Sequence, residues 1–400
     1  MKVLFVCHRV PFPPKRGGKI RPFNIIRHLT SQGHEVTVAS LARNADEVSQ
    51  ARGLSDHCAR VLVEVIPDSV AWGRMIAWLP TSKPSSFGYF YSGSLARQIE
   101  KELRTHRYDL VFVHCSSVAP YVQSVTGPAK IFDYGDVDSQ KWREYSTSRP
   151  FPLAAGYWLE AVKLERTERL LSQNFDLCTC TTRAELDTLR QLGVTVPTDW
   201  FPNGVDTAFF APAGGDYDPG LIAFVGRMDY YPNQQAVQNF CRDVLPKLRA
   251  RLPGMRFEIV GADPSRAIRE LGRIDGVTVT GSVPDVRPYV TRAALTVAPL
   301  EIARGTQNKI LESMAMGVPV VCSRQASGGV DAVVGEHLLT AGSTDEYVAA
   351  IAKVLGSRDE RQRLAHAGRV RVLTHHSWES SMRRLDGLID GVVSRRTEAA

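Results

Sequence analysis

The sequence lacks any hydrophobic run long enough to cross a membrane. A spanning helix needs about 18 or more consecutive apolar residues, and the best candidate, residues 70–79, is interrupted by Arg74. The opening segment, Met-Lys-Val-Leu-Phe-Val-Cys, is too short for a signal sequence and is typical of a first strand. We therefore expect a cytoplasmic protein, at most peripheral on the cytoplasmic face of the inner membrane.

The sequence also lacks a disulfide framework and a convincing metal-binding cluster. Seven cysteines are scattered over 400 residues, an odd number without regular spacing, which indicates buried thiols in a reducing compartment. Apart from Asp136-Val-Asp138, no His, Cys or Asp cluster has the spacing of metal ligands. The net charge is +7, but the basic residues are dispersed without a motif of stacking aromatics, which argues against a nucleic-acid partner. We expect neither a metal nor a cofactor.

The chain instead contains two successive series of short apolar runs that alternate with helical patterns. Such alternation predicts an α/β fold with two doubly wound, Rossmann-like domains that face each other across a cleft. We expect domains at 1–205 and 206–375, a linker at 214–220, and a C-terminal helix at 376–392. The expected strands are 2–8, 34–41, 60–66, 109–115, 129–134 and 177–182 in the first series, and 221–226, 256–261, 277–280, 294–299 and 318–322 in the second.

The most informative segment is 304–321, Arg-Gly-Thr-Gln-Asn-Lys-Ile-Leu-Glu-Ser-Met-Ala-Met-Gly-Val-Pro-Val-Val. It lies between two expected strands and predicts a polar loop followed by a helix. Helix starts at the carboxyl edge of a parallel sheet bind anions. Lys309 and Glu312, three positions apart, lie on one face of this helix, so the lysine can meet a phosphate while the glutamate accepts from a hydroxyl. An ordinary surface ion pair is the alternative.

Two other strand ends are suited to an anion. Gly17 and Gly18 separate the first strand from the first helix and let a backbone approach a ligand closely. Four basic residues surround them, Lys15, Arg16, Lys19 and Arg21. In the second series, Gly226 ends a strand and delivers Arg227, whose planar fork matches diphosphate oxygens.

These motifs, together with Asn203-Gly-Val-Asp206, resemble the GT-B glycosyltransferases of family 4 over nearly all 400 residues. The segments 10–21, Asp136-Val-Asp-Ser-Gln-Lys-Trp and Gly305-Thr-Gln-Asn-Lys look like the sugar transferases associated with exosortase (PEP-CTERM) exopolysaccharide systems. The resemblance implies a metal-independent, retaining hexosyltransferase. Its partners would be a nucleotide-sugar donor and a glycan or lipid-linked acceptor, and the donor would be held by the second domain.

The resemblance also implies roles for individual residues. Glu312 would bind the donor ribose, and Arg227 with Lys309 would neutralise the departing diphosphate. The first domain would close on the donor through Gly17 and Gly18. The remaining donor-binding candidates are Arg304, Thr306, Gln307 and Asn308.

The sequence departs from the family pattern at three places. Arg304 stands where the first of two glutamates is expected, and the lysine usual after the Gly-Arg pair is replaced by Asp229-Tyr-Tyr-Pro-Asn, so that Lys309 is its substitute. The first-domain histidine near the reacting sugar has no clear match. Asp136 and Asp138 are therefore the candidate acceptor-side groups, as general base, with His114 as a weaker candidate.

Three alternatives remain open at this point. Asp136-Val-Asp138 is also the metal-binding signature of the single-domain GT-A transferases. The missing glutamate and histidine would suit a non-catalytic scaffold on a degenerate transferase fold. A nucleotide-sugar epimerase of related architecture is the third. Release of free nucleotide only with acceptor present distinguishes transfer from the latter two.

Two further segments give structural expectations. The aromatic-rich segment 72–91 suits an acceptor pocket, an interfacial patch, or helices packed on the core. Trp378, Met382, Leu385 and Leu388 form one stripe on the last helix, which we expect to pack against the first domain.

Overall fold

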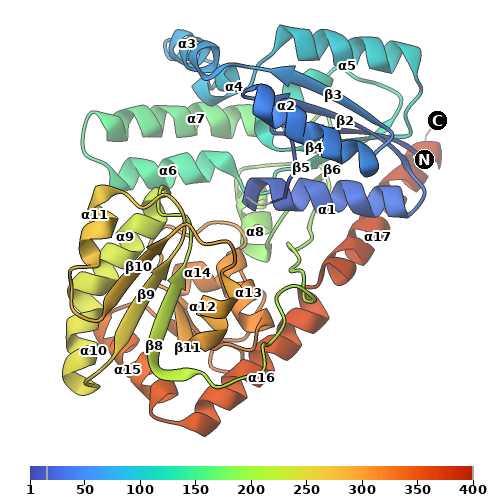
Figure 1. Cartoon of the computed structure of the whole chain (residues 1–400). Coiled ribbons are helices and arrows are strands. Elements are labelled where there is room, and N and C mark those ends of the chain that lie inside the picture. Colours follow the sequence, from blue (N-terminus) through green and yellow to red (C-terminus); the bar gives the residue numbers. More distant parts are fainter. Residues whose placement is uncertain (15–16, 399–400) are drawn as a thin grey trace. The chain divides into compact units, whose positions relative to one another are not determined.

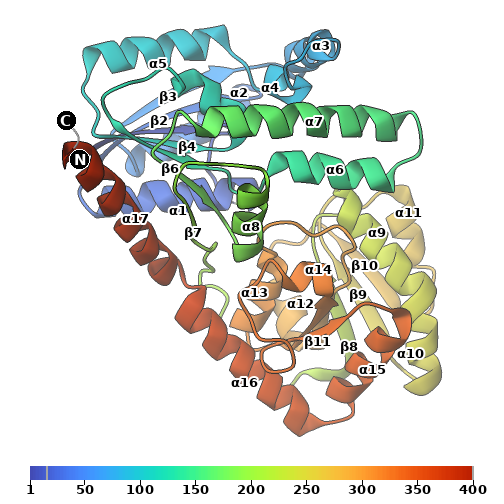
Figure 2. The same ribbon diagram turned by 180° about the vertical axis from the view of Figure 1, so that it is seen from behind.

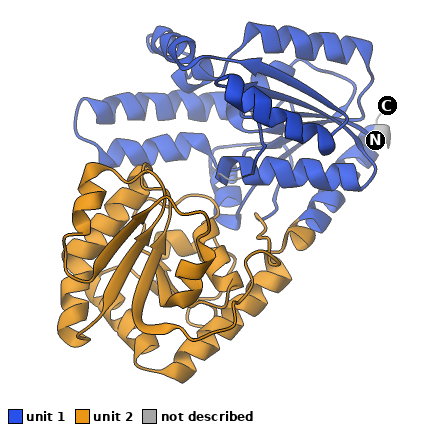
Figure 3. Cartoon of the chain, viewed as in Figure 1, with its two compact units in different colours: residues 1–202, 382–400 blue, residues 203–381 orange. Residues whose placement is uncertain are grey.

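The computed structural model describes residues 1–14 and 17–398, and the chain divides into two compact units. Unit 1 comprises residues 1–202 and 382–400, and unit 2 comprises residues 203–381 (Figure 3). The expected linker at 214–220 is wrong, because its last residues already belong to a strand of unit 2. Each unit is built on its own parallel sheet.

The sheet of unit 1 has the strand order β3-β2-β1-β4-β5-β6-β7. Every pairing is parallel, and strands β1, β4 and β5 are buried almost throughout, as expected for strands covered on both faces. The strands are β1 (Lys2–Cys7), β2 (Glu35–Ala42), β3 (Arg60–Val65), β4 (Leu110–His114), β5 (Ala129–Asp133), β6 (Leu177–Cys180) and β7 (Thr198–Trp200).

Helices cover both faces of this sheet. Figure 1 shows α1 and α2 in front of the strands, whereas α7 and α8 come to the front in Figure 2. The helices are α1 (Gly17–Ser31), α2 (Ala45–Ala51), α3 (Asp68–Trp78), α4 (Ser85–Tyr89), α5 (Gly93–Thr105), α6 (Asp138–Ser148), α7 (Leu153–Ser172) and α8 (Arg183–Gln191), with short 3-10 segments at η1 (Arg52–Asp56) and η2 (Ser116–Val122).

Unit 2 repeats the design with the strand order β10-β9-β8-β11-β12-β13, again parallel. Its strands are β8 (Asp218–Val225), β9 (Arg256–Val260), β10 (Val277–Gly281), β11 (Ala293–Ala298), β12 (Val320–Ser323) and β13 (Leu339–Ala341). Its helices are α9 (Tyr231–Asn239), α10 (Leu245–Arg251), α11 (Arg266–Leu271), α12 (Arg287–Arg292), α13 (Asn308–Ala315), α14 (Arg324–Ser327), α15 (Thr344–Leu355) and α16 (Arg358–His375), with a π-helical turn at η3 (Phe240–Val244).

Ordinary capping interactions mark the ends of several of these helices. Gly33 ends the first helix with a φ of 79°, a conformation that favours glycine. Ser343 and Ser357 cap α15 and α16 by accepting from the backbone N–H of the glutamate three positions on. All eleven expected strands are present, and only the short strands β7 and β13 were not anticipated.

The last helix, α17 (Trp378–Glu398), begins in unit 2 and belongs to unit 1 from Met382 onward. Within unit 1, Arg384 donates to the carbonyl of Trp200, and Asp386 pairs with His28 at 2.7 Å. The expected return of the helix to the first domain is confirmed. Trp378 lies against Gly204, where no Cβ would fit. Gly204 is within the expected first domain of residues 1–205, although both residues belong to unit 2.

Candidate functional site

The best-defined feature of unit 2 is a cation fixed at the carboxyl end of β8. Lys309, the second residue of α13, places its Nζ 2.6 Å from Oδ1 of Asn233 on α9 and 4.4 Å from the centre of the Phe224 ring. A Cβ at Gly226 would lie 3.1 Å from that ammonium and 2.7 Å from the Asn233 amide. Only glycine fits at position 226 without displacing these groups. Contacts with α9 and β8 thus hold the Lys309 side chain of α13 at the edge of the sheet.

A second glycine brings the ends of β8 and β9 together. Gly261 has a φ of 156°, and a Cβ there would lie 1.8 Å from the carbonyl oxygen of Gly226. Any side chain at this position would force the two strands apart. The backbone beneath Lys309 is thus held by packing that only glycine allows.

Lys309 and Glu312 of α13 are both half-buried, and burial shifts the pKa of each side chain. It lowers the pKa of Lys309 to about 7 and raises the pKa of Glu312 to about 7, and each charge partly offsets the shift of the other. The charged forms of both side chains are therefore poorly solvated. A ligand that brings a phosphate to Lys309 and hydroxyl donors to Glu312 would favour both charged forms.

Arg227 is less available than the sequence suggests. Its guanidinium donates to both oxygens of Asp229, at 3.0 and 2.6 Å, and to Oδ2 of Asp263 at 2.7 Å. Asp263 follows β9 and has a left-handed φ of 57°. Two carboxylates thus neutralise Arg227, which weakens its attraction for a diphosphate.

The loop before α13 carries the remaining donor-side candidates. Gly305 presents its carbonyl oxygen 2.0 Å from the position of a Cβ on Gly329, which fixes the loop against that glycine. Gln307 donates to the carbonyl of the half-buried Arg304 at 3.0 Å. Oγ1 of Thr306 and Oδ1 of Asn308 are buried, and neither has a hydrogen-bond partner in the described part of the chain. Such atoms are costly to leave unpaired, and they suit a polar ligand at this loop.

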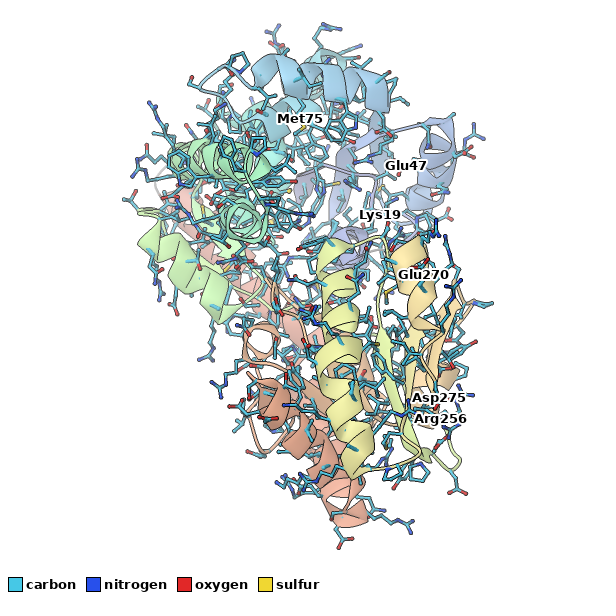
Figure 4. The ribbon with its side chains drawn as sticks, turned by 90° about the vertical axis from the view of Figure 1, so that its left-hand side faces the viewer. Lys19, Glu47, Met75, Arg256, Glu270 and Asp275 are labelled. Carbon is cyan, nitrogen blue, oxygen red and sulfur yellow. The ribbon has the colours of Figure 1, made fainter. Side chains whose placement is uncertain are left out.

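In unit 1, Gly17 and Gly18 begin α1 and have open space where a Cβ would point. Of the four basic residues expected around them, the structure describes Lys19 and Arg21. Lys19 is buried, and its Nζ lies 3.9 Å from a carboxylate oxygen of Glu47; both residues are labelled in Figure 4. Arg21 is also buried. Lys15 and Arg16 lie outside the described residues. Helical geometry therefore turns Lys19 and Arg21 inward rather than toward an anion.

The partner of Arg21 is a buried carboxylate that the sequence did not single out. Asp133, at the end of β5, accepts two bonds from Arg21 at 2.8 Å and one from Thr179 at 2.9 Å. Its Oδ2 also lies 2.7 Å from Nδ1 of His114. Arg21 holds the pKa of this fully buried carboxyl well below its usual range, against the effect of burial.

The contacts of Asp133 distinguish His114 from the other two acceptor-side candidates, Asp136 and Asp138. Because the ionised Asp133 accepts from Nδ1 of His114, Nε2 of that imidazole is left unprotonated in the neutral ring and can act as a base. Asp138 accepts from Ser116 at 3.3 Å, and the exposed Asp136 accepts from Thr181 at 3.3 Å. Only His114 has the orientation by a carboxylate that is typical of a catalytic base.

A buried acid lies near Asp138. Glu168 on α7 is fully buried, and its polar neighbours include Ser116 and Ser139. Burial, with a smaller effect of Asp138, raises the pKa of Glu168 to about 8. It is therefore mostly neutral at pH 7. Nothing in the sequence distinguished it from the other glutamates of that helix.

No group of three or more His, Cys, Asp or Glu side chains in the described residues is arranged to hold a metal ion. No helix in the same part of the chain is long and apolar enough to cross a membrane.

Comparisons with known proteins relate both parts of the chain to glycosyltransferases. Residues 16–209 match the family model described as Glycosyltransferase Family 4, and residues 219–357 match the model described as Glycosyl transferases group 1. An MMP alpha-(1->4)-mannosyltransferase from Mycolicibacterium hassiacum is 26% identical over 245 residues. That match spans 58% of each chain.

Similar solved structures cover nearly the whole chain. Sucrose-phosphate synthase from Thermosynechococcus elongatus aligns with a TM-score of 0.73 and 16% identity, over 99% of this chain and 100% of the other. HepE from Anabaena, solved in complex with UDP, aligns with a TM-score of 0.69 and 14% identity, over 98% and 100%. The chain thus has the two-unit fold of the GT-B glycosyltransferases, and two glycosyltransferase family models match successive parts of it. The GT-A alternative is wrong, because both doubly wound units match the two-unit fold.

Proposed function

We propose that the protein is a retaining, metal-independent hexosyltransferase of exopolysaccharide biosynthesis. It would move a sugar from a nucleotide-diphosphate donor to a glycan or lipid-linked acceptor. The observation that carries the proposal is the pairing of Lys309, fixed against Gly226 and Asn233, with Glu312 one turn further along the same helix.

The order of groups along α13 supports a direction for the donor. Glu312 would accept from the ribose hydroxyls, and Lys309 would bind the diphosphate. The sugar would then lie toward the loop of Arg304, Thr306, Gln307 and Asn308, where two buried oxygens have no protein partner among the described residues. Gly17 and Gly18 would let the backbone of unit 1 approach the phosphates.

The chemical step requires stabilisation of the leaving group. When the glycosyl bond breaks, negative charge develops on the diphosphate, and a fixed cation stabilises that state more than the ground state. Lys309 would supply this cation without a metal, and Arg227 would join it after release from Asp229 or Asp263. His114, oriented by Asp133, would accept the proton of the acceptor hydroxyl.

The engagement of Arg227 by two carboxylates also favours a second candidate, a nucleotide-sugar-binding scaffold without turnover. A thermal-shift screen against a panel of nucleotide sugars tests donor binding, since a bound ligand raises stability by mass action. Nucleotide release, measured with and without acceptor, then distinguishes the two. A scaffold binds the donor but releases no nucleotide.

A further inference from the structure

Unit 1 exposes an unusually apolar helix. Of the residues of α3, only Ala71 is buried, and the large side chains Val70, Trp72 and Ile76 point to solvent, with Trp72 54% and Ile76 60% exposed. Leu79, directly after the helix, is exposed as well. Single exposed apolar residues are normal on a protein surface, but a contiguous group marks an interaction site.

A second group of exposed apolar residues lies on the beginning of α7. The chain enters this helix through Phe151, which is 84% exposed, and the exposed side continues with Leu153, Trp158, Leu159 and Val162. The two groups are neighbours, because Nζ of Lys163 on α7 donates to the carbonyl of Leu79 at 2.7 Å. Figures 1 and 2 both show α3 and the first half of α7 at the same end of unit 1. We call this surface the α3–α7 face.

The charged groups of the α3–α7 face are mainly cations. Arg74 lies 5.5 Å from the ring of Tyr91, Lys83 lies 5.2 Å from the ring of Trp78, and Lys163 stands beside Leu79. Their aliphatic stems cover apolar surface while the charged heads remain near water. By contrast, α5 of the same unit exposes Glu100, Lys101 and Arg104 in the mixed pattern of an ordinary solvated helix.

The acids nearest these cations are already engaged. Glu160 of α7 is buried, and its carboxylate accepts from the backbone N–H groups of Ser85 and Ser86. Asp68, at the start of α3, accepts from Tyr89 and lies 3.8 Å from Arg43. The face therefore combines tryptophan, phenylalanine and leucine side chains with a positive rim.

We infer that the α3–α7 face docks on the surface of a bilayer that contains anionic phospholipids. Tryptophan and phenylalanine favour the headgroup boundary, and each basic residue near an anionic surface adds attraction that salt screens. This combination favours a lipid surface over a protein partner. The inference rests on unit 1 alone and is independent of donor binding in unit 2.

The test is co-sedimentation of the full chain with vesicles of phosphatidylcholine mixed with phosphatidylglycerol, and with vesicles of phosphatidylcholine alone. The protein should sediment with the anionic vesicles, and high salt should weaken the association. The double variants Trp72→Ser/Ile76→Ser and Leu153→Ser/Trp158→Ser should each lose at least about tenfold in vesicle partitioning, as expected when buried apolar area is removed.

A matched control comes from unit 2. Val370 and Leu373 on α16 are exposed to a similar degree, 45% and 41%, and Val370→Ser/Leu373→Ser should sediment like the wild type. Thermal unfolding and donor binding, measured on every variant, show whether both units remain folded. Failure of donor binding with vesicle association retained would refute the proposed function and leave this inference intact.

Three results would overturn the inference. The wild type does not sediment with anionic vesicles, the control loses binding as much as the face variants, or binding is independent of anionic lipid. Light scattering in solution adds a fourth. A wild-type dimer that the face variants convert to monomer would assign the surface to self-association instead.

Discussion

Removal of the charge of Lys309 is the most informative perturbation of the donor site. Lys309→Met keeps a similar side-chain volume against Gly226 and Phe224 but has no ammonium group. A hydrogen bond to a charged group contributes about 1.5–3 kcal/mol, so the affinity for a nucleoside diphosphate should fall by roughly 10- to 150-fold. Isothermal titration calorimetry against uridine, guanosine, adenosine, cytidine and thymidine diphosphates measures the change.

A second substitution tests whether the charge itself is what matters. Oδ1 of Asn233 lies 2.6 Å from Nζ of Lys309, so a lysine at 233 can place its charge close to the same point. Asn233→Lys in the Lys309→Met background should recover most of the affinity. Lys247→Met is the matched control, because Lys247 is an exposed lysine of unit 2 paired with Asp345. Full affinity in a folded Lys309→Met protein would refute the assignment.

The same titration has a defined pH dependence. A bound diphosphate favours the charged ammonium, and burial lowers the pKa of Lys309 to about 7. Binding above pH 7 must therefore take up a proton, and the affinity should fall there by up to about tenfold per pH unit. Glu312, with its pKa raised to about 7, accepts more strongly from hydroxyls when it is ionised, so affinity should also fall below pH 7. Lys309→Met should lose the alkaline fall and keep the acidic one.

Three other predictions concern Glu312, the requirement for a metal, and Glu168. Glu312→Ala should weaken binding of the nucleotide sugar by roughly 1.5–3 kcal/mol, and unchanged affinity with an intact fold would exclude a role in donor binding. Transfer activity should survive chelator treatment, whereas loss with EDTA and recovery with manganese would mean that a metal holds the diphosphate. Glu168→Gln concerns stability. Because folding raises the pKa of Glu168 from 4.5 to about 8, the folded protein retains a proton that the unfolded chain releases, and wild-type stability falls as pH rises between these values. Gln does not ionise, so the variant should match the wild type near pH 4.5 and have a higher Tm above pH 8, and equal pH profiles would contradict the buried-acid interpretation.

The fold was predictable from the sequence because a parallel sheet covered on both faces has apolar strands at regular intervals. The two strands that the sequence did not predict, β7 and β13, are short and lie at the edges of their sheets. Such strands have little room for an apolar run. The expected linker at 214–220 was wrong for a related reason, since glycine and proline there precede and begin β8 rather than separate domains.

The candidate sites were predictable only where neighbouring residues act together. Lys309 and Glu312 share one helix, so their spacing was informative. Asn233 is separated from Lys309 by 76 positions and Asp133 from Arg21 by 112, and no local pattern connects such pairs. Sequence proximity was misleading for Lys19 and Arg21, because the helix that begins at Gly17 turns both side chains into unit 1.

Acceptor-dependent release of nucleotide diphosphate is the measurement that tests the central claim most directly. The protein is incubated with each nucleotide sugar, alone and with lipid-linked glycans extracted from bacterial membranes, and the free nucleotide diphosphate is quantified. We predict release from one donor, stimulated by the acceptor fraction and strongly reduced in Lys309→Met. Binding of a nucleotide sugar without any release, in the presence of every acceptor fraction, would contradict transfer and leave a binding protein on a transferase fold.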